Sequence, residues 1–84
     1  MAEYRILFHP AALLEFRSLD GGVRAVVAKQ LAKLAKFPYL GDLLGNRHGY
    51  DLTGYRKMYA DRKRIHIVYS IVEDLVLVKI IAIG

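Results

Sequence analysis

Three apolar-rich segments in the last thirty residues constrain the fold of this 84-residue chain more than any other feature. They run roughly over Tyr55–Asp61, Arg64–Val72 and Leu75–Ile83. Hydrophobic and polar residues alternate along them, which is typical of strands that bury one face. The gaps between them, Arg62-Lys63 and Glu73-Asp74, have the length of two-residue hairpin connections. The pattern therefore predicts three consecutive antiparallel strands.

The first half of the chain predicts a strand and two helices. Tyr4–Phe8 is expected to be a short strand, and Pro10 suits the first turn of a helix over Ala11–Leu19. Val23–Phe37 is expected to be the second helix, because its apolar residues recur at helical spacing. We expect a single α+β domain over residues 1–84, with two N-terminal helices packed on a small twisted antiparallel sheet in the order β-α-α-β-β-β.

The segment between the helices and the last strands is interpreted as a long loop. Tyr39–Gly54 contains glycine at positions 41, 45, 49 and 54. A loop of this length inside a small domain is usually functional or mobile. We therefore include Arg47, which lies in this segment, among the candidate nucleic-acid contacts.

Composition excludes several kinds of site. There is no cysteine, so the chain has no disulfide, thiolate metal site or cysteine nucleophile. The three histidines lack metal-ligand spacing, and we expect no metal or other cofactor. The start lacks a basic region followed by an apolar run, so we expect no signal peptide. The longest apolar stretch is too short for a bilayer and is broken by Lys79, so we expect a cytoplasmic protein that does not associate with membranes.

Positive charge is concentrated on one predicted hairpin. The formal net charge is +5 and the sequence pI is about 9.7. Between Arg56 and Arg64 the chain has five cations and one anion, Asp61. A cationic hairpin of this kind suits a polyanion, and RNA is the leading candidate. Three lysines of the second helix also share one face, which is either an ordinary solvated face or a binding surface: Lys29, Lys33 and Lys36.

Strand alternation places several polar side chains on one face of the sheet. If both connections have two residues, Tyr59 lies opposite His66, and Lys79 lies opposite Val68. The side chains expected to converge there are Lys57, Tyr59, Arg64, His66 and Lys79. This face is either merely solvent-exposed or a site for phosphodiester cleavage, in which a histidine can serve either proton-transfer role. Tyrosine can stack on a base.

Several sequence segments, taken as a set, resemble the RelE/ParE toxin superfamily of bacterial toxin–antitoxin modules. They are Asp51-Leu-Thr-Gly-Tyr-Arg-Lys57, Arg64-Ile-His-Ile-Val-Tyr69 and Val78-Lys-Ile-Ile-Ala-Ile-Gly84, preceded by the strand–helix opening and by Phe37-Pro38 after the second helix. The resemblance covers essentially the whole chain. It implies ribosome-dependent mRNA cleavage for a member of the RelE branch, gyrase poisoning for a member of the ParE branch, and a cognate acidic antitoxin as partner.

The resemblance also assigns candidate residues. In the RelE branch it implies catalysis by a cationic cluster on the sheet, and Lys57 matches one of its lysines. Tyr59 stands where some members have a second lysine, and His66 stands where the pattern usually has arginine. Members commonly continue past the position of Gly84 with further catalytic groups. Either this chain is part of a longer protein, or we expect it to lack part of the usual site.

These observations predict a toxin that cleaves mRNA on the ribosome. We expect Lys57 and His66 to transfer protons and stabilise charge, and Tyr59 to stack on a base. Arg56 and Arg64 are expected to bind phosphate. The further nucleic-acid contacts are expected to be Lys29, Lys33, Lys36, Arg47, Arg62, Lys63 and Lys79. A gyrase-directed toxin, and a catalytically inactive relative that only binds its antitoxin or RNA, are the alternatives.

Overall fold

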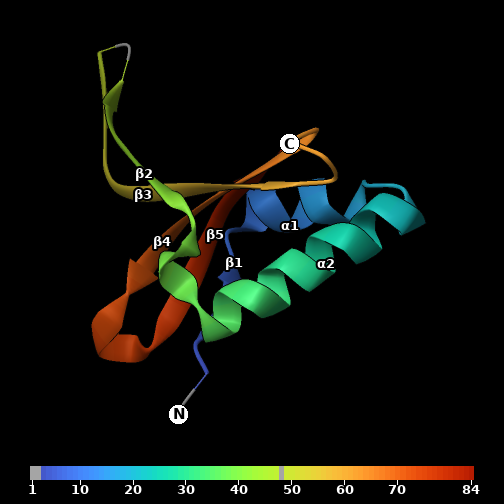
Figure 1. Cartoon of the computed structure of the whole chain (residues 1–84), viewed down its shortest axis with the longest axis horizontal. Coiled ribbons are helices and arrows are strands. Elements are labelled where there is room, and N and C mark those ends of the chain that lie inside the picture. Colours follow the sequence, from blue (N-terminus) through green and yellow to red (C-terminus); the bar gives the residue numbers. More distant parts are fainter. Residues whose placement is uncertain (1–2, 48) are drawn as a thin grey trace.

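Residues 3–47 and 49–84 are described by a computed structural model, in which two helices pack on a five-stranded sheet (Figure 1). In chain order the elements are β1 (Arg5–Phe8), α1 (Pro10–Arg17), α2 (Gly21–Lys36), the short 3-10 helix η1 (Pro38–Leu40), β2 (Asp42–Arg47), β3 (Tyr50–Ala60), β4 (Ile65–Val72), the short 3-10 helix η2 (Glu73–Leu75) and β5 (Leu77–Ile83). The strands lie in the order β1-β5-β4-β3-β2. The predicted α+β fold class is confirmed.

Local sequence explains where the helices begin. The Nδ1 atom of His9 accepts a hydrogen bond from the Ala11 N–H at 3.2 Å, and Pro10 takes the first helical position, where its missing N–H costs nothing. His9 therefore caps α1. The two helices are separate, as predicted, but α2 begins at Gly21 rather than at Val23.

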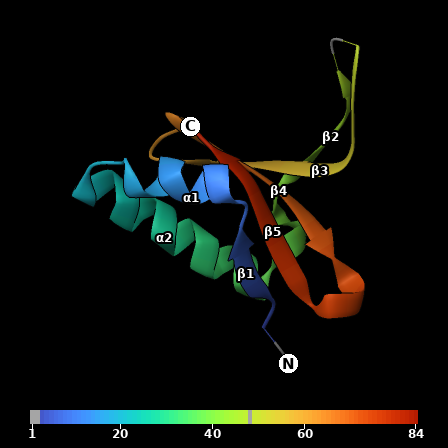
Figure 2. The same ribbon diagram turned by 180° about the vertical axis from the view of Figure 1, so that it is seen from behind.

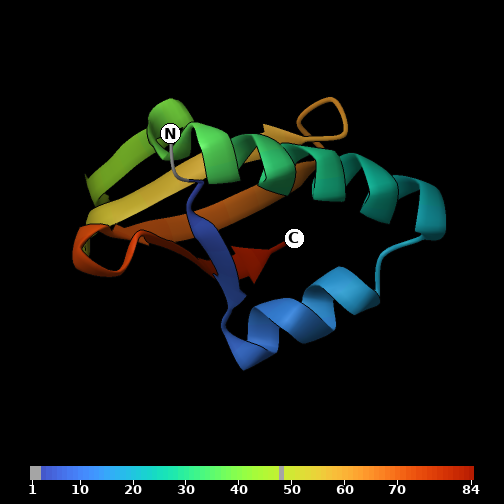
Figure 3. The same ribbon diagram turned by 90° about the horizontal axis from the view of Figure 1, so that it is seen from below.

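The core lies between the helices and one face of the sheet. Its buried members come from α1, α2, β3, β4 and β5: Ala12, Val27, Leu31, Leu34, Ala60, Ile67, Tyr69, Val78, Ile80 and Ile83. Figure 3 shows α2 running alongside β3. Burying this apolar surface is the main stabilising contribution to a domain of this size. Neither helix in the described part of the chain is long and apolar enough to cross a membrane.

The sheet differs from the prediction in two respects. It is mixed, because β1 pairs parallel to β5, which places β5 between β1 and β4 (Figure 2). The predicted loop Tyr39–Gly54 instead contains the end of η1, all of β2 and the beginning of β3. Strands β2 and β3 form a hairpin that extends away from the helices (Figure 1). The glycines allow irregular backbone in this hairpin. The register shifts between Leu43 and Gly45, and Gly54 has a φ of +88°, a conformation that favours glycine.

One of the two predicted hairpin connections is confirmed and the other is wrong. Arg62 and Lys63 are the central residues of a β-turn with φ of 56° and 69°, closed by a 3.1 Å hydrogen bond from the Arg64 N–H to the Asp61 carbonyl. The second connection is longer than two residues, because η2 and the left-handed Val76 join β4 to β5.

Candidate functional site

The face of the sheet opposite the core carries the candidate site. Because side chains alternate along a strand, the buried Ala60 and Ile67 send their neighbours Tyr59 and His66 to the other face. Tyr59 lies directly opposite His66, and Lys57 lies opposite Val68, as predicted. This register follows from the β-turn at Arg62-Lys63, since a turn of known length determines which residues face each other.

Four side chains meet around one phenol ring, and we call them the Tyr59 cluster: Lys57, Tyr59, Lys63 and His66. The Lys57 ammonium nitrogen lies over the Tyr59 ring, 4.8 Å from its centroid, and the Lys63 nitrogen lies 5.7 Å from the same point. The His66 imidazole meets the ring edge-on, at 5.0 Å between centroids and an interplanar angle of 79°. Both rings and both ammonium groups are at least partly exposed, so the cluster is open to a ligand.

Electrostatics in the cluster makes the Tyr59 phenol easier to deprotonate. Hydrogen bonding to Lys57 and the positive charge of Lys57 lower the pKa of Tyr59, and the charge of Lys63 acts in the same direction. Partial burial and the carboxylate of Asp42 oppose the shift, but the net pKa is below that of an ordinary tyrosine. The cluster can therefore stabilise negative charge, either on the phenol or on a bound anion.

The turn after β3 brings Lys63 back over the sheet. Asp61, Arg62 and Lys63 all have positive φ, a conformation that costs a residue with a side chain about 1–2 kcal/mol. Asp61 tolerates it better than most, because its short polar side chain can hydrogen-bond locally. The tight turn folds the chain back, so that Lys63 contacts Tyr59 while Arg62 and Arg64 are exposed at the tip.

Several predicted site residues lie outside the Tyr59 cluster. Arg56 lies three residues before Tyr59 on β3, so its side chain points to the other face of the sheet. Its guanidinium donates to the carbonyl oxygens of Gly41 at 2.7 Å and Tyr39 at 3.4 Å. Lys79 lies opposite Ser70 rather than Val68, because the β4–β5 connection is longer than predicted. Ser70 is four residues from His66, or roughly 13 Å along β4, so Lys79 is not part of the cluster.

The remaining predicted contacts are dispersed. Lys29, Lys33 and Lys36 are exposed on α2, in the helical layer on the other side of the sheet from the Tyr59 cluster. Arg47 ends β2 in the hairpin, and His48 lies outside the described residues. The predicted contacts are therefore spread over both sides of the sheet rather than gathered at the Tyr59 cluster.

Two residues near the cluster were missed by sequence reasoning. Asp42 pairs with Lys57 across the β2–β3 ladder, which is why its charge acts on Tyr59. The Gln30 side-chain N–H donates to the Tyr59 carbonyl oxygen at 2.8 Å and ties α2 to the end of β3. Only recognition of β2 as a strand could have identified Asp42. Within residues 3–47 and 49–84, no group of three His, Asp or Glu side chains is arranged to hold a metal ion.

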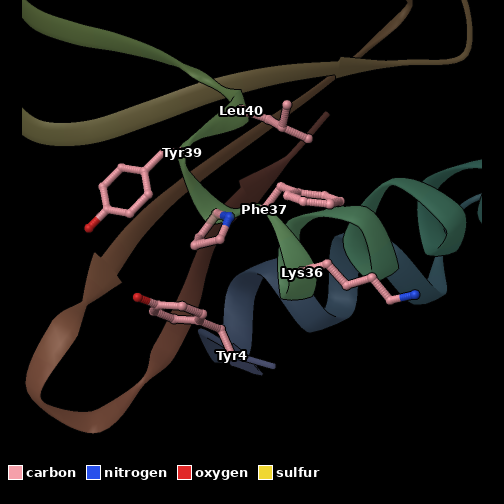
Figure 4. Close-up of a pocket in the computed structure, with 6 residues that line it drawn as sticks. Tyr4, Lys36, Phe37, Tyr39 and Leu40 are labelled. Atoms are coloured by element: carbon pink, nitrogen blue, oxygen red, sulfur yellow. The ribbon is translucent and has the colours of Figure 1, made fainter. Parts of the chain in front are cut away.

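A second surface feature lies at the end of α2. Residues from the chain start, α2 and η1 line an open apolar hollow of about 470 Å³: Tyr4, Lys36, Phe37, Pro38, Tyr39 and Leu40 (Figure 4). Phe37, Tyr39 and Leu40 are each at least half exposed. The hollow contains no member of the Tyr59 cluster.

Comparison with known proteins finds similarity in structure rather than in sequence. No protein-family model and no curated protein matches the chain. The isolated RelE toxin of E. coli superposes with a TM-score of 0.80 at 25% identity, over 96% of this chain and 82% of that one. A variant of E. coli RelE in complex with a peptide of the antitoxin RelB superposes with a TM-score of 0.79 at 27% identity, over 100% of this chain and 83% of that one.

A more distant structure supports the fold. The RelBE2 toxin–antitoxin complex of Mycobacterium tuberculosis gives a TM-score of 0.79 at 22% identity, over 100% of this chain and 92% of the matched chain. The E. coli RelE structures match at higher identity, along nearly the whole chain. Together with the segments around Lys57, His66 and Gly84, these similarities show that the chain has the fold of the RelE toxins and resembles the RelE branch of the RelE/ParE toxin superfamily.

Proposed function

We propose that this protein is the toxin of a type II toxin–antitoxin module and that it cleaves mRNA bound to the ribosome, in the cytoplasm. The observation that carries the proposal is the Tyr59 cluster, in which two ammonium groups, an imidazole and a phenol share an open sheet face. The structural similarity to RelE toxins supports the same function.

The cluster suits cleavage of an RNA phosphodiester. The reaction needs a group that takes the proton of the 2′-hydroxyl and cations that stabilise the charge on the phosphorane. His66 takes the proton, since an imidazole nitrogen can serve as a general base. Lys57 and Lys63 stabilise the developing negative charge. The exposed Arg62 and Arg64 bind flanking phosphates.

The other cations suit a second contact area. Lys29, Lys33 and Lys36 lie on the helical layer, so we propose that they contact ribosomal RNA while the Tyr59 cluster contacts mRNA. Such phosphate contacts position a protein without reading sequence. Because each contact releases counterions, binding to the ribosome should weaken as salt concentration rises.

We also propose that an acidic antitoxin is the cognate partner. RelE occurs with RelB in the similar complexes from E. coli and Mycobacterium tuberculosis. A net charge of +5 favours an acidic partner, and the half-exposed Phe37, Tyr39 and Leu40 supply apolar contact area. Co-purification with the product of the neighbouring gene tests this partner. The proposal fails if that product does not bind even at low salt.

In vitro cleavage of ribosome-bound mRNA tests the catalytic assignment. We expect His66→Ala to cut about 10² to 10⁴ times more slowly than wild type, since a positioned acid or base contributes about that much. Lys57→Ala should be similarly slow. Arg5→Ala removes one charge from the far edge strand and should cut at the wild-type rate. Thermal unfolding of each variant controls for folding.

The order of events in cells separates the proposal from the alternatives. After expression without antitoxin, pulse labelling should show that protein synthesis falls before DNA synthesis. Early loss of DNA synthesis with DNA breaks would identify a gyrase-directed toxin instead. Growth without any arrest would identify a relative that only binds its antitoxin or RNA.

A further inference from the structure

We propose that the Tyr59 hydroxyl is the general acid of RNA cleavage and protonates the 5′-oxygen that leaves. This role rests on the proposed ribonuclease function. It differs from the base-stacking role expected from the sequence, and it assigns a chemical step to a residue where relatives can have a lysine.

The surroundings of the phenol ring suit an acid better than a stacking platform. Two ammonium groups lie over the ring, at 4.8 and 5.7 Å from its centroid, and His66 meets it edge-on at 5.0 Å. A base that stacked on Tyr59 would compete with the ammonium groups for the face of the ring. A phosphate bound beside both rings would instead use them, because the cations attract it and the phenol and imidazole are in edge-on contact.

The charges around Tyr59 stabilise its deprotonated form. Lys57 from β3 and Lys63 from the turn favour the phenolate, whereas Asp42 from β2 opposes it. His66 faces the ring from β4, and Gln30 from α2 binds only the backbone carbonyl. The net pKa of the phenol is lowered. Tyr59 therefore gives up its proton more readily than an ordinary tyrosine.

The reaction step balances with these two residues. The His66 imidazole takes the proton of the 2′-hydroxyl, and the 2′-oxygen forms a bond to phosphorus. The bond between phosphorus and the 5′-oxygen breaks, and that oxygen takes the proton of the Tyr59 hydroxyl. The products are a 2′,3′-cyclic phosphate and a 5′-hydroxyl. Proton transfer from the imidazolium to the phenolate, directly or through water, restores the site.

The backbone holds the phenol in place. Tyr59 pairs with His66 in the β3–β4 ladder, and Gln30 donates to its carbonyl oxygen at 2.8 Å. The β-turn that follows keeps Lys63 near the ring. The Tyr59 side chain is therefore held by its backbone hydrogen bonds and by the side chains around its ring. Such a fixed position suits proton transfer, which requires the two reacting atoms to be close and aligned.

A substrate with a better leaving group tests the assignment. In such an mRNA, sulfur replaces the 5′-oxygen at the scissile position mapped with wild type, so the leaving thiolate needs no proton. We expect Tyr59→Phe to cut ordinary ribosome-bound mRNA about 10² to 10⁴ times more slowly than wild type. We expect it to cut the sulfur substrate at nearly the wild-type rate. Tyr59→Phe keeps the aromatic ring, so base stacking alone would be preserved.

The outcomes separate the role of Tyr59 from the proposed function. Tyr4→Phe, which removes the hydroxyl of a tyrosine outside the Tyr59 cluster that donates to Glu73, is the matched control and should cut both substrates like wild type. If Tyr59→Phe cuts ordinary mRNA like wild type, or is equally slow on both substrates, Tyr59 is not the general acid although the ribonuclease function stands. If wild type cuts neither substrate, the ribonuclease function fails and the role of Tyr59 fails with it.

Discussion

Replacing Tyr69 by phenylalanine should strongly destabilise the protein, although the substitution removes a single oxygen atom. The Tyr69 hydroxyl is buried in the core, donates to the Pro38 carbonyl at 2.7 Å and accepts from the Gly41 N–H at 2.8 Å. Burial raises the pKa of this phenol, so it stays neutral and keeps donating. The two hydrogen bonds hold η1, and with it the start of β2, against the sheet.

The size of the effect follows from the two groups that lose their partner. Tyr69→Phe leaves a buried N–H and a buried carbonyl, and each costs about 1–3 kcal/mol when unsatisfied. Some relaxation of η1 towards solvent would recover part of this. We expect a loss of about 2–4 kcal/mol in the free energy of unfolding, a large share of the roughly 5–15 kcal/mol of a typical domain. For a domain of this size, that corresponds to a drop of about 10–25 °C in Tm.

Urea and thermal unfolding followed by circular dichroism measure this loss. Tyr4→Phe is the matched control, because the Tyr4 hydroxyl donates to the exposed Glu73 carboxylate at 3.0 Å and water can replace that contact. Its stability should change far less. If Tyr69→Phe unfolds at the wild-type midpoint, the Tyr69 hydroxyl does not hold η1, and the reasoning about β2 fails.

Three further predictions concern neighbouring backbone and the phenol. Gly41→Ala should destabilise the fold, since a Cβ atom there would lie 2.5 Å from the Tyr69 hydroxyl oxygen and 2.8 Å from the Lys57 carbonyl oxygen. The double variant with Tyr69→Phe should lose less unfolding free energy than the sum of the losses of the two single variants. Gly54→Ala should cost only about 1–2 kcal/mol of backbone strain, because φ is +88° but no atom lies within 4 Å of the added Cβ; a larger loss of stability in urea would show that packing is disturbed. In an ultraviolet titration of the folded protein, the phenolate absorbance of Tyr59 should rise at lower pH than that of an ordinary tyrosine, because its pKa is lowered. This early rise should be absent in Tyr59→Phe. Identical titration curves for the two proteins would contradict the lowered pKa.

Hydrophobic periodicity was sufficient to predict most of the fold. The helical spacing of Val27, Leu31 and Leu34 correctly indicated the face of α2 that is buried. The missing strand, β2, was hidden by the glycines in and around it, which indicate a loop when read alone but serve a bulge and a bend in the β2–β3 hairpin. The parallel pairing of β1 with β5 could not be read from local pattern, because it joins residues more than seventy positions apart.

The sequence predicted the positions of site residues only where it also predicted the length of the turn between their strands. The β-turn at Arg62-Lys63 determines that Tyr59 faces His66, so that pair followed from the sequence. The position of Lys79 did not, because η2 makes the second connection longer. Arg56 was grouped with the site by its place in a run of cations, whereas strand parity sends it to the other face, where it holds η1.

The electrostatics of the site depends on contacts that no short segment contains. Tyr69 and Arg56 both bind the backbone around η1, and this places β2 beside β3. Pairing with β3 brings the Asp42 carboxylate near Lys57, where it partly offsets the effect of the lysines on the Tyr59 phenol. The position of Asp42 beside Lys57 thus depends on the pairing of β2 with β3, and the buried Tyr69 hydroxyl holds the segment that leads into β2. Residue types at Lys57, Tyr59 and His66 indicate which chemistry is possible, but the balance of charge among them is a property of the assembled sheet.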